Sequence, residues 1–188
     1  QQYFGPNGNP VDALRIWKGG LGIWGAILIG ACGAFIYFKT HNTTLKFSQF
    51  LDALAPGVVL AQAIGRIGNW FNQELFGKPT DLPWGLEIKQ SSRPDGYEQF
   101  LTFHPTFLYE AIWCTVIALV ILKYGAKLKA GQSFALYVAT YCVGRFFIEL
   151  IRIDTANTIA GLRVNVWVSV LVAAGAALYF ARASKKIQ

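Results

Sequence analysis

The stretch FLDALAPGVVLAQAIGRIGNWFNQELFG, residues 50–77, starts as an apolar segment and ends in a polar cluster. From Gly65 to Gly77 it contains one arginine, two asparagines, one glutamate and three glycines. Charged and amide side chains are costly in lipid, so their presence at the end of an apolar span marks a candidate functional site. The stretch therefore predicts a membrane-spanning helix that carries a polar site at its end.

The composition of the whole chain is typical of a membrane protein. Of its 188 residues, 54% are hydrophobic and 14% are charged, whereas soluble domains average about 25% charged residues. A transmembrane helix needs about 20 predominantly apolar residues. Five blocks reach or approach that length: residues 20–38, 50–64, 107–122, 133–150 and 164–181. We predict an all-α polytopic membrane protein with about five transmembrane helices.

The second block is the weakest of these candidate spans. It is short, and it includes Asp52, Pro56 and Gln62. The alternative fold is a large soluble protein with buried helices, which would need more polar helix faces than the sequence contains. Hydropathy favours the membrane protein.

Basic residues indicate the orientation of these spans. They fall between the first and second spans, between the third and fourth, and after the fifth: Lys39, Lys46, Lys123, Lys127, Lys129, Arg182, Lys185 and Lys186. Positively charged loops stay in the cytoplasm, so we predict an extracytoplasmic N-terminus and a cytoplasmic C-terminus. Because the basic residues lie at span ends, the net charge of +7 indicates topology and contact with anionic lipid rather than nucleic-acid binding.

Residues 78–106 are predicted to form a small extracytoplasmic β-rich head. Pro79, Pro83 and Pro94 interrupt any helix there, and residues 84–88 alternate weakly as a strand does. Residues 1–188, with this segment included, are expected to form a single membrane-embedded domain. The three cysteines lie singly inside spans, as packing residues do, and we predict neither a metal site nor a cofactor.

The polar residues of the spans are predicted to converge in the outer leaflet. Arg66 comes sixteen residues after Phe50, about 24 Å along a helix, and Arg145 comes twelve residues after Ser133, about 18 Å along. Both therefore lie in the outer half of a core about 30 Å thick. Other polar or aromatic residues fall at similar depth: Trp24, Tyr109, Glu110, Glu149, Arg152 and Asn165.

Two converging arginines predict an anion partner, because a guanidinium group binds carboxylate or phosphate through two parallel hydrogen bonds. Asn69 and Asn72 add neutral donors and acceptors, and the glycines at 65, 68 and 77 would let a lipid headgroup approach the backbone. The alternative is an internal ion-pair network, with Arg145 on Glu149 and Arg66 on Glu74 or Glu110.

Four segments resemble the prolipoprotein diacylglyceryl transferase family. In chain order they are WKGGLGIWGA (17–26), GRIGNWFNQELFG (65–77), HPTFLYE (104–110) and GRFFIELIRID (144–154). The resemblance implies a bacterial inner-membrane enzyme. It would move the sn-1,2-diacylglyceryl group of phosphatidylglycerol to the lipobox cysteine of a preprolipoprotein as a thioether, release glycerol 1-phosphate, and precede cleavage by signal peptidase II.

The resemblance also implies roles for individual residues. Arg66, Asn69, Glu74 and Gly77 match functional positions of the central signature, and Arg145 with Glu149 matches an essential pair on a late helix. Two features depart from the family pattern. Trp24 stands where some members have a histidine, which excludes a base there. The family usually has seven spans, so we expect its first two, with a motif tyrosine, to be absent from this sequence.

From these residues we predict a phosphate clamp made by Arg66 and Arg145. The general base stays open between His104, Glu149, Glu74 and arginine-assisted attack. The predicted substrate-binding residues are Arg66, Asn69, Asn72, Gly77, Arg145, Tyr109 and Trp24. The expected partners are phosphatidylglycerol, preprolipoprotein signal peptides with a lipobox cysteine and membrane lipid, with no nucleic acid.

Other functions fit the sequence less well. An anion transporter or channel would spread its charges through the membrane and would show broken helices in repeated halves. Intramembrane proteases would need His-Glu-x-x-His or Gly-x-Ser-x-Gly, and both patterns are missing from the sequence. A lipid phosphotransferase would need paired aspartates. A non-catalytic assembly protein is excluded by the motif match and not by composition.

Overall fold

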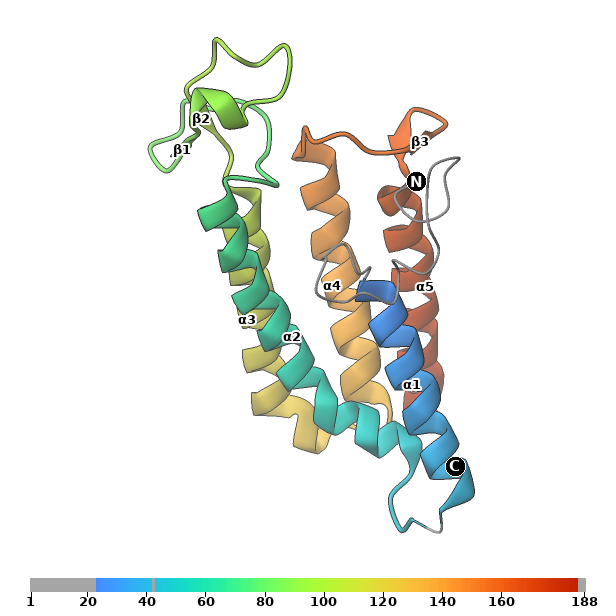
Figure 1. The fold of residues 1–188 in the computed structure, drawn as a ribbon. Helices are drawn as coiled ribbons and strands as arrows, with labels where there is room; N and C mark the ends of the chain where they lie inside the picture. The colour runs from blue at the N-terminus through green and yellow to red at the C-terminus, as the bar shows by residue number, and fades with distance from the viewer. Residues whose placement is uncertain (1–22, 42, 186–188) are drawn as a thin grey trace. The chain divides into compact units, whose positions relative to one another are not determined.

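The computed structural model describes residues 23–41 and 43–185, which Figure 1 draws in colour. The chain divides into two compact units, Gln1–Phe47 and Ser48–Gln188. In the first unit, helix α1 (Ile23–Thr40) covers most of the first predicted span, whose beginning lies outside the described residues. The side chain of Trp24 also lies outside them. His41 is exposed, and its ring stacks on Tyr37 at 4.3 Å.

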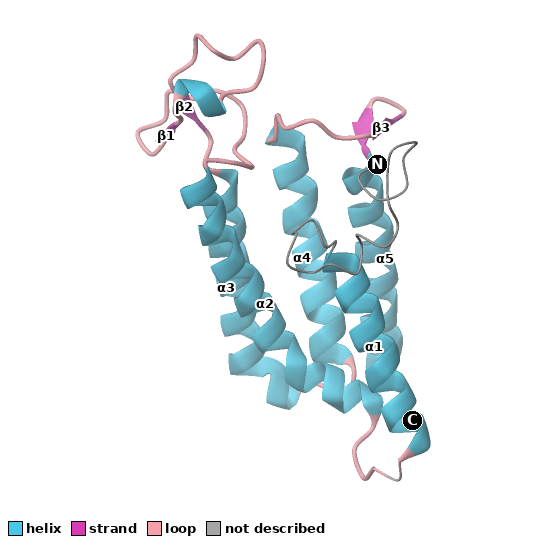
Figure 2. Cartoon of the chain, viewed as in Figure 1, coloured by secondary structure: helices cyan, strands magenta, loops and turns pink. Residues whose placement is uncertain are grey.

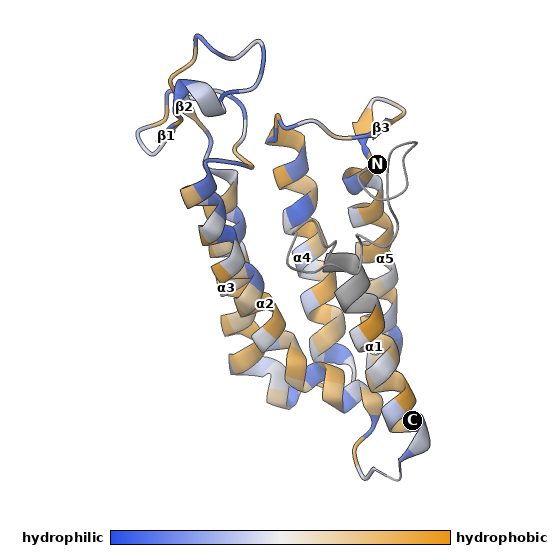
Figure 3. Cartoon of the chain, in the orientation of Figure 1, coloured by the Kyte–Doolittle hydropathy of each residue, from blue (hydrophilic) through white to orange (hydrophobic). Residues whose placement is uncertain are grey.

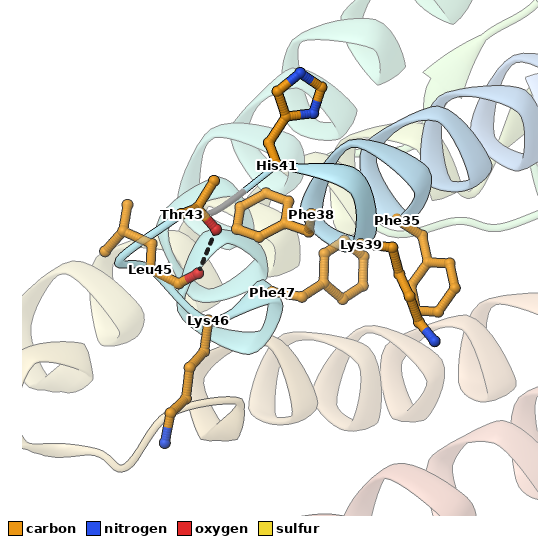
Figure 4. Close-up of a pocket in the computed structure, with 8 residues that line it drawn as sticks. All are labelled: Phe35, Phe38, Lys39, His41, Thr43, Leu45, Lys46 and Phe47. Carbon is orange, nitrogen blue, oxygen red and sulfur yellow. Dashed lines mark hydrogen bonds between the residues drawn. The ribbon is translucent and has the colours of Figure 1, made fainter.

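The first unit has a hollow beside the loop that follows α1 (Figure 4). The residues that line it include three phenylalanines and two lysines: Phe35, Phe38, Phe47, Lys39 and Lys46. Figure 4 shows the two ammonium groups pointing away from one another. Because the basic groups do not converge on one point, the hollow lacks the geometry of an anion site.

The second unit contains the four described helices that are long and apolar enough to cross a membrane. They are α2 (Phe47–Asn72, whose first residue belongs to the first unit), α3 (Thr106–Tyr124), α4 (Gln132–Ile151) and α5 (Val164–Lys185). Figure 3 shows apolar residues along these helices and polar residues gathered near their ends. The described residues thus have four such helices where the sequence predicted about five in the chain.

The sequence underestimated the second span. Helix α2 has 26 residues, because the polar residues after Ile64 lower the hydropathy without ending the helix. Pro56 lies inside α2, where its ring removes one backbone hydrogen bond, and Figure 1 shows the helix bent in its first half. Residues 65–72 of the central signature (65–77) therefore belong to helix α2 and continue it.

Small side chains of α2 bring it close to its neighbours. Ala55, Val59 and Ala63 follow one another at four-residue spacing and are buried against residues of α3 and α4: Cys114, Ile117, Ala118, Ile121 and Tyr137. Close approach through small residues is the usual way in which helices associate in a membrane. Helix α4 packs against α3 and α5, so α3 and α4 connect α2 with α5.

A polar contact links the opposite end of α2 to α4. Asp52 accepts hydrogen bonds from the backbone N–H groups of Gly131, at 2.5 Å, and Phe134, at 2.9 Å. Gly131 has φ of +89° and has no side chain with which to cap α4. Asp52, which weakened the prediction of this span, therefore caps the N-terminus of a neighbouring helix.

The head between α2 and α3 is mostly loop and turn rather than β-rich (Figure 2). Its regular structure is the antiparallel pair β1 (Leu86–Glu87) and β2 (Thr102–Phe103), with the short 3₁₀ helix η3 (Gln90–Ser92). Ile88 and Phe103 form its small core with Phe76. The prolines and glycines that end helices here also prevent longer strands.

Residues 151–163, which the sequence showed only as a short connection, contain a second hairpin. Strand β3 (Thr158–Ile159) pairs with β4 (Leu162–Arg163). Ala160, with φ of +51°, and Gly161, with φ of +78°, form its turn. A single backbone bridge joins Gly77 to Arg152, so the end of α4 and the beginning of the head lie together.

Candidate functional site

Helices α2, α3 and α4 all contribute charged side chains to a buried cluster. Arg66 Nη2 lies 2.8 Å from Glu110 Oε1, and Arg145 Nη1 lies 3.0 Å from Glu110 Oε2. The Tyr141 hydroxyl donates a third bond to Glu110, at 3.0 Å. The Glu110 side chain is only 3% exposed. One carboxylate from α3 thus holds two guanidinium groups from the helices on either side of it in this cluster.

The two arginines differ in how many donors they have left. Arg145 reaches Glu110 through Nη1 and Glu149 through Nη2. Arg66 contacts Glu110 through Nη2 alone, and within the described part of the chain its Nε and Nη1 atoms have no hydrogen-bond partner. A guanidinium group carries five N–H donors. Arg66, with 21% of its side chain exposed, is therefore the arginine that can take a further anion.

Glu149 is the second hub of the cluster, and its side chain is fully buried. Besides Arg145, it contacts Arg163 Nε at 2.5 Å and Arg152 Nη1 at 3.6 Å, and it accepts a hydrogen bond from Asn165. The Arg163 N–H is not directed at the carboxylate oxygen 2.5 Å away, so this pair is an ion contact without a hydrogen bond. The arginines that enclose this carboxylate separate it from any substrate group.

Asp154 extends the cluster outside the membrane spans. Arg152 binds it through two hydrogen bonds, at 2.7 and 2.8 Å, and Arg163 Nη2 adds a third at 2.8 Å. Partial burial raises the pKa of Asp154, but the hydrogen bonds and charges of the two arginines outweigh burial and leave that pKa below its ordinary value. Asp154 is therefore a carboxylate at neutral pH.

Among the described residues this cluster joins four guanidinium groups to three carboxylates: Arg66, Arg145, Arg152 and Arg163 with Glu110, Glu149 and Asp154. One positive charge is left over. Buried charges need partners, so the surplus favours the approach of one more anion, on the side where Arg66 is exposed.

The end of α2 holds Glu74 in a smaller polar group. Asn69 and Asn72 each donate a hydrogen bond of 2.9 Å to Glu74 Oε1. Asn69 lies three residues after Arg66, on the same helix face. Glu74 is exposed, and its Oε2 atom has no partner in the described ranges. The arrangement presents one carboxylate oxygen held by two amides and leaves the other oxygen open.

Gly77 closes the turn that carries Glu74. Its N–H donates to the His104 carbonyl at 2.8 Å, and a Cβ atom placed on it would lie 2.9 Å from the Ile151 carbonyl oxygen and 2.9 Å from a Thr106 methyl. Gly77 was predicted to bind substrate, but it is buried against protein. The close approach that requires glycine here is with the backbone of the chain itself.

His104 and Tyr109 form a group of their own. His104 Nδ1 and the Tyr109 hydroxyl lie 3.1 Å apart, and Trp84 of the head donates to that hydroxyl at 2.9 Å. The tautomer of His104 decides which atom of the His104–Tyr109 pair donates. This chain of contacts ties the head to the start of α3.

The structure therefore brings the predicted site residues into three neighbouring groups. Arg66, Arg145 and Glu149 share the buried cluster, Asn69 and Asn72 hold Glu74, and the remaining described residues, Gly77, His104 and Tyr109, lie at the junction with the head. Glu110 was predicted to lie at the depth of the two arginines and to be a possible partner of Arg66, but it was not among the predicted site residues. Its signal was a carboxylate inside an apolar span, opposite two arginines. In the described ranges no three His, Cys, Asp or Glu side chains are grouped to hold a metal ion.

Comparison with known proteins identifies the family of the chain. A family model described as prolipoprotein diacylglyceryl transferase matches residues 2–182. The chain belongs to the prolipoprotein diacylglyceryl transferase family. It is 59% identical over 177 residues to phosphatidylglycerol–prolipoprotein diacylglyceryl transferase 2 of Streptomyces coelicolor, covering 93% of this chain and 55% of that protein.

Two further relatives carry the same name without the number. The protein of Streptomyces griseus is 51% identical over 188 residues, covering 98% of this chain and 56% of that protein. The protein of Cutibacterium acnes is 50% identical over 178 residues, covering 94% and 60%. The chain thus spans little more than half the length of these transferases.

Proposed function

We propose that this protein transfers the sn-1,2-diacylglyceryl group of phosphatidylglycerol to the lipobox cysteine of a preprolipoprotein. Family membership and the names of relatives that are 50–59% identical support the reaction. The observation that carries the proposal is the buried Glu110, which holds Arg66 and Arg145 and leaves donors of Arg66 without a partner in the described part of the chain.

The free donors of Arg66 suit the phosphate of phosphatidylglycerol. In the proposed reaction the cysteine sulfur attacks the glycerol carbon that bears the phosphate. A carbon–sulfur bond forms, the carbon–oxygen bond breaks, and the thiol proton leaves to a base. The phosphodiester, with one negative charge, becomes a phosphate monoester with two. Arg66 stabilises the charge that grows on the leaving group, which lowers the barrier more than it favours substrate binding.

Arg145 has a different part in this proposal. Both of its terminal nitrogens are engaged by carboxylates, so it orients Glu110, and Glu110 orients Arg66. Of the two arginines of the predicted clamp, Arg66 meets the phosphate in this proposal, and Arg145 holds Glu110, the partner of Arg66.

The general base in this proposal is Glu74. A thiol with an ordinary pKa of about 8.5 is largely protonated at neutral pH and needs a proton acceptor. Glu74 has an open oxygen and is exposed, whereas Glu149 is enclosed by arginines. His104 remains the second candidate, because its Nδ1 atom is paired with Tyr109 while its Nε2 atom has no partner in the described ranges.

We place the protein in the bacterial inner membrane, with the site and head extracytoplasmic, the N-terminus extracytoplasmic and the C-terminus cytoplasmic. The basic residues Lys123, Lys129 and Lys185 support this orientation, because they gather at one end of α3 and α5. Lys129 Nζ donates to the carbonyls of Ala183 and Ser184, so the α3–α4 loop lies at the end of α5, and both carry the charge typical of cytoplasmic ends.

The test is transfer by the purified protein in vesicles that contain phosphatidylglycerol, with a lipobox peptide as acceptor. We expect the peptide to gain one diacylglyceryl group and the vesicles to release an equal amount of glycerol phosphate. A peptide with serine in place of cysteine is the matched control and should remain unmodified. Wild-type protein that modifies neither peptide would reject the proposal.

A further inference from the structure

The turn that carries Glu74 has an unusual backbone. Gln73 has φ of +51° and Leu75 has φ of +57°, so residues in the left-handed region flank Glu74 on both sides. Neither is glycine, and neither is asparagine or aspartate, which tolerate this region better. Such backbone costs energy and persists only where surrounding contacts hold it, which occurs most often at functional sites.

Contacts from outside the turn hold each of the two strained residues. The Gln73 side-chain oxygen accepts a hydrogen bond of 3.1 Å from the backbone N–H of Lys89 in the head. The Leu75 carbonyl accepts a hydrogen bond of 2.5 Å from the Thr106 hydroxyl at the start of α3. Thr106 is only 1% exposed, so water does not compete for that hydroxyl.

Glu74 lies between these two fixed points. Its own N–H donates to the Asn69 carbonyl at 3.2 Å, and its carboxylate is held through one oxygen by Asn69 and Asn72. Connecting α2 to the head does not require a strained backbone, because glycine at position 73 or 75 would adopt a positive φ without strain. What the strained, anchored turn adds is a fixed position for the free oxygen of Glu74.

We propose that Thr106 and Gln73 are positioning residues that hold Glu74 for proton transfer, which makes the head part of the catalytic apparatus. This inference rests on the proposed function, in which Glu74 takes the thiol proton. A merely structural turn would use the same hydrogen bonds, so the test must separate positioning from stability.

The first test compares Thr106→Val with Thr106→Ser in the membrane-embedded protein. Valine keeps the shape and removes the hydroxyl, whereas serine keeps the hydroxyl. We expect Thr106→Val to lower kcat about tenfold or more, since small displacements of a catalytic group reduce rates strongly, with little change in KM for phosphatidylglycerol. Thr106→Ser should stay within about twofold of wild type. Equal kcat in both variants would overturn the proposal.

A double mutant separates positioning from stability. If Thr106 acts through Glu74, Thr106→Val should add no further loss to the residual rate of Glu74→Gln. A structural role would reduce kcat by the same factor in both backgrounds, and that result would overturn the proposal. Wild-type protein that forms no thioether would instead reject the proposed function itself.

Gln73 provides a second pair should Thr106→Val fail to fold. Gln73→Met keeps the length of the side chain and removes the acceptor for the Lys89 N–H, whereas Gln73→Glu keeps an acceptor oxygen. We expect kcat to fall in Gln73→Met and to be largely retained in Gln73→Glu, and the Gln73→Met loss should vanish in the Glu74→Gln background. Loss of the same size in both backgrounds would overturn the proposal.

Discussion

Arg66 on α2 and Glu110 on α3 form an ion pair, with 2.8 Å between Arg66 Nη2 and Glu110 Oε1. The pair joins two membrane-spanning helices beneath the head, and among the described residues the other nitrogens of Arg66 have no partner. Glu110 is therefore both a bridge between helices and the group that orients the arginine proposed to meet the phosphate.

Replacing Glu110 by glutamine should destabilise the protein and impair transfer. The substitution leaves Arg66 and Arg145 without their shared counter-charge, and breaking a buried ion pair costs about 3–5 kcal/mol. The measurement is the thermal unfolding midpoint in detergent together with kcat. Tyr141→Phe, which removes only a hydroxyl bonded to Glu110, should cost about 1 kcal/mol. Equal effects of both variants would contradict the role of Glu110 as hub.

Arg66→Lys should lower kcat about 100-fold, as removal of a donor to a growing negative charge does in other enzymes. Lysine keeps the charge but lacks the planar group that contacts Glu110 and phosphate at once. The protein should still insert and pack, because Arg66 is partly exposed. Kinetics at saturating phosphatidylglycerol test this, and an unchanged kcat would exclude Arg66 from the reaction.

Gly77→Ala and Gly68→Ala should differ sharply in stability. A methyl group on Gly77 meets the Ile151 carbonyl oxygen at 2.9 Å, and overpacking of this kind costs about 1–3 kcal/mol. A methyl group on Gly68 meets no atom within 4 Å in the described part of the protein, and alanine favours the helix. The thermal unfolding midpoints of the two variants check this. A Gly77→Ala protein as stable as Gly68→Ala would contradict the close approach of Gly77 to the Ile151 backbone.

Asp52→Ala should destabilise α4 by about 0.5–2 kcal/mol, the usual cost of losing an N-terminal cap. The aspartate lies at the end of α2 opposite the head, so kcat of the folded fraction should be unchanged. Asp52→Asn is the control, because its one carbonyl oxygen can replace part of the cap. If Asp52→Ala unfolds at the wild-type midpoint, the cap does not contribute.

The hydrogen bonds of Arg152 and Arg163 to Asp154 predict that the stability of the fold decreases in acid. Partial burial raises the pKa of Asp154, but Arg152 and Arg163 together lower it by more than burial raises it, so the net shift of the pKa is downward. A carboxylate whose pKa is lower in the folded state than in the unfolded state stabilises the fold when the pH is above its unfolded-state pKa of about 3.9. This stabilisation is lost as the pH falls through the folded-state pKa. The thermal unfolding midpoint of the wild type should therefore fall once the pH is below about 4, and it should fall less in Asp154→Asn. If the unfolding midpoints of wild type and Asp154→Asn fall in parallel with pH, Asp154 does not cause the loss of stability.

Much of the site could be predicted from the sequence, because helical rise alone brings Arg66 and Arg145 to similar depth and charges in lipid need partners. The predicted pairing of Arg145 with Glu149 is confirmed. The choice between Glu74 and Glu110 as partner of Arg66 could not be made, since it depends on how α3 is rotated against α2.

Other features depended on tertiary structure. The strained turn at Gln73 and Leu75 has no sequence signal, because both residues ordinarily avoid positive φ and are held there by Lys89 and Thr106. The head was predicted to be β-rich from a weak alternation over residues 84–88, and only two of those residues pair as a strand. Arg163 reaches Glu149 because the β3–β4 hairpin returns the chain to α4, a path that spacing alone does not show.

Transfer of the diacylglyceryl group can be read from the intact mass of a lipobox peptide after incubation with phosphatidylglycerol vesicles. Wild-type and Arg66→Ala proteins would be compared at equal amounts of folded protein. We expect wild type to add one diacylglyceryl group per cysteine with equimolar glycerol phosphate release, and Arg66→Ala to do so at least about 100-fold more slowly. An unmodified peptide with wild type, or equal rates for the two proteins, would contradict the proposal.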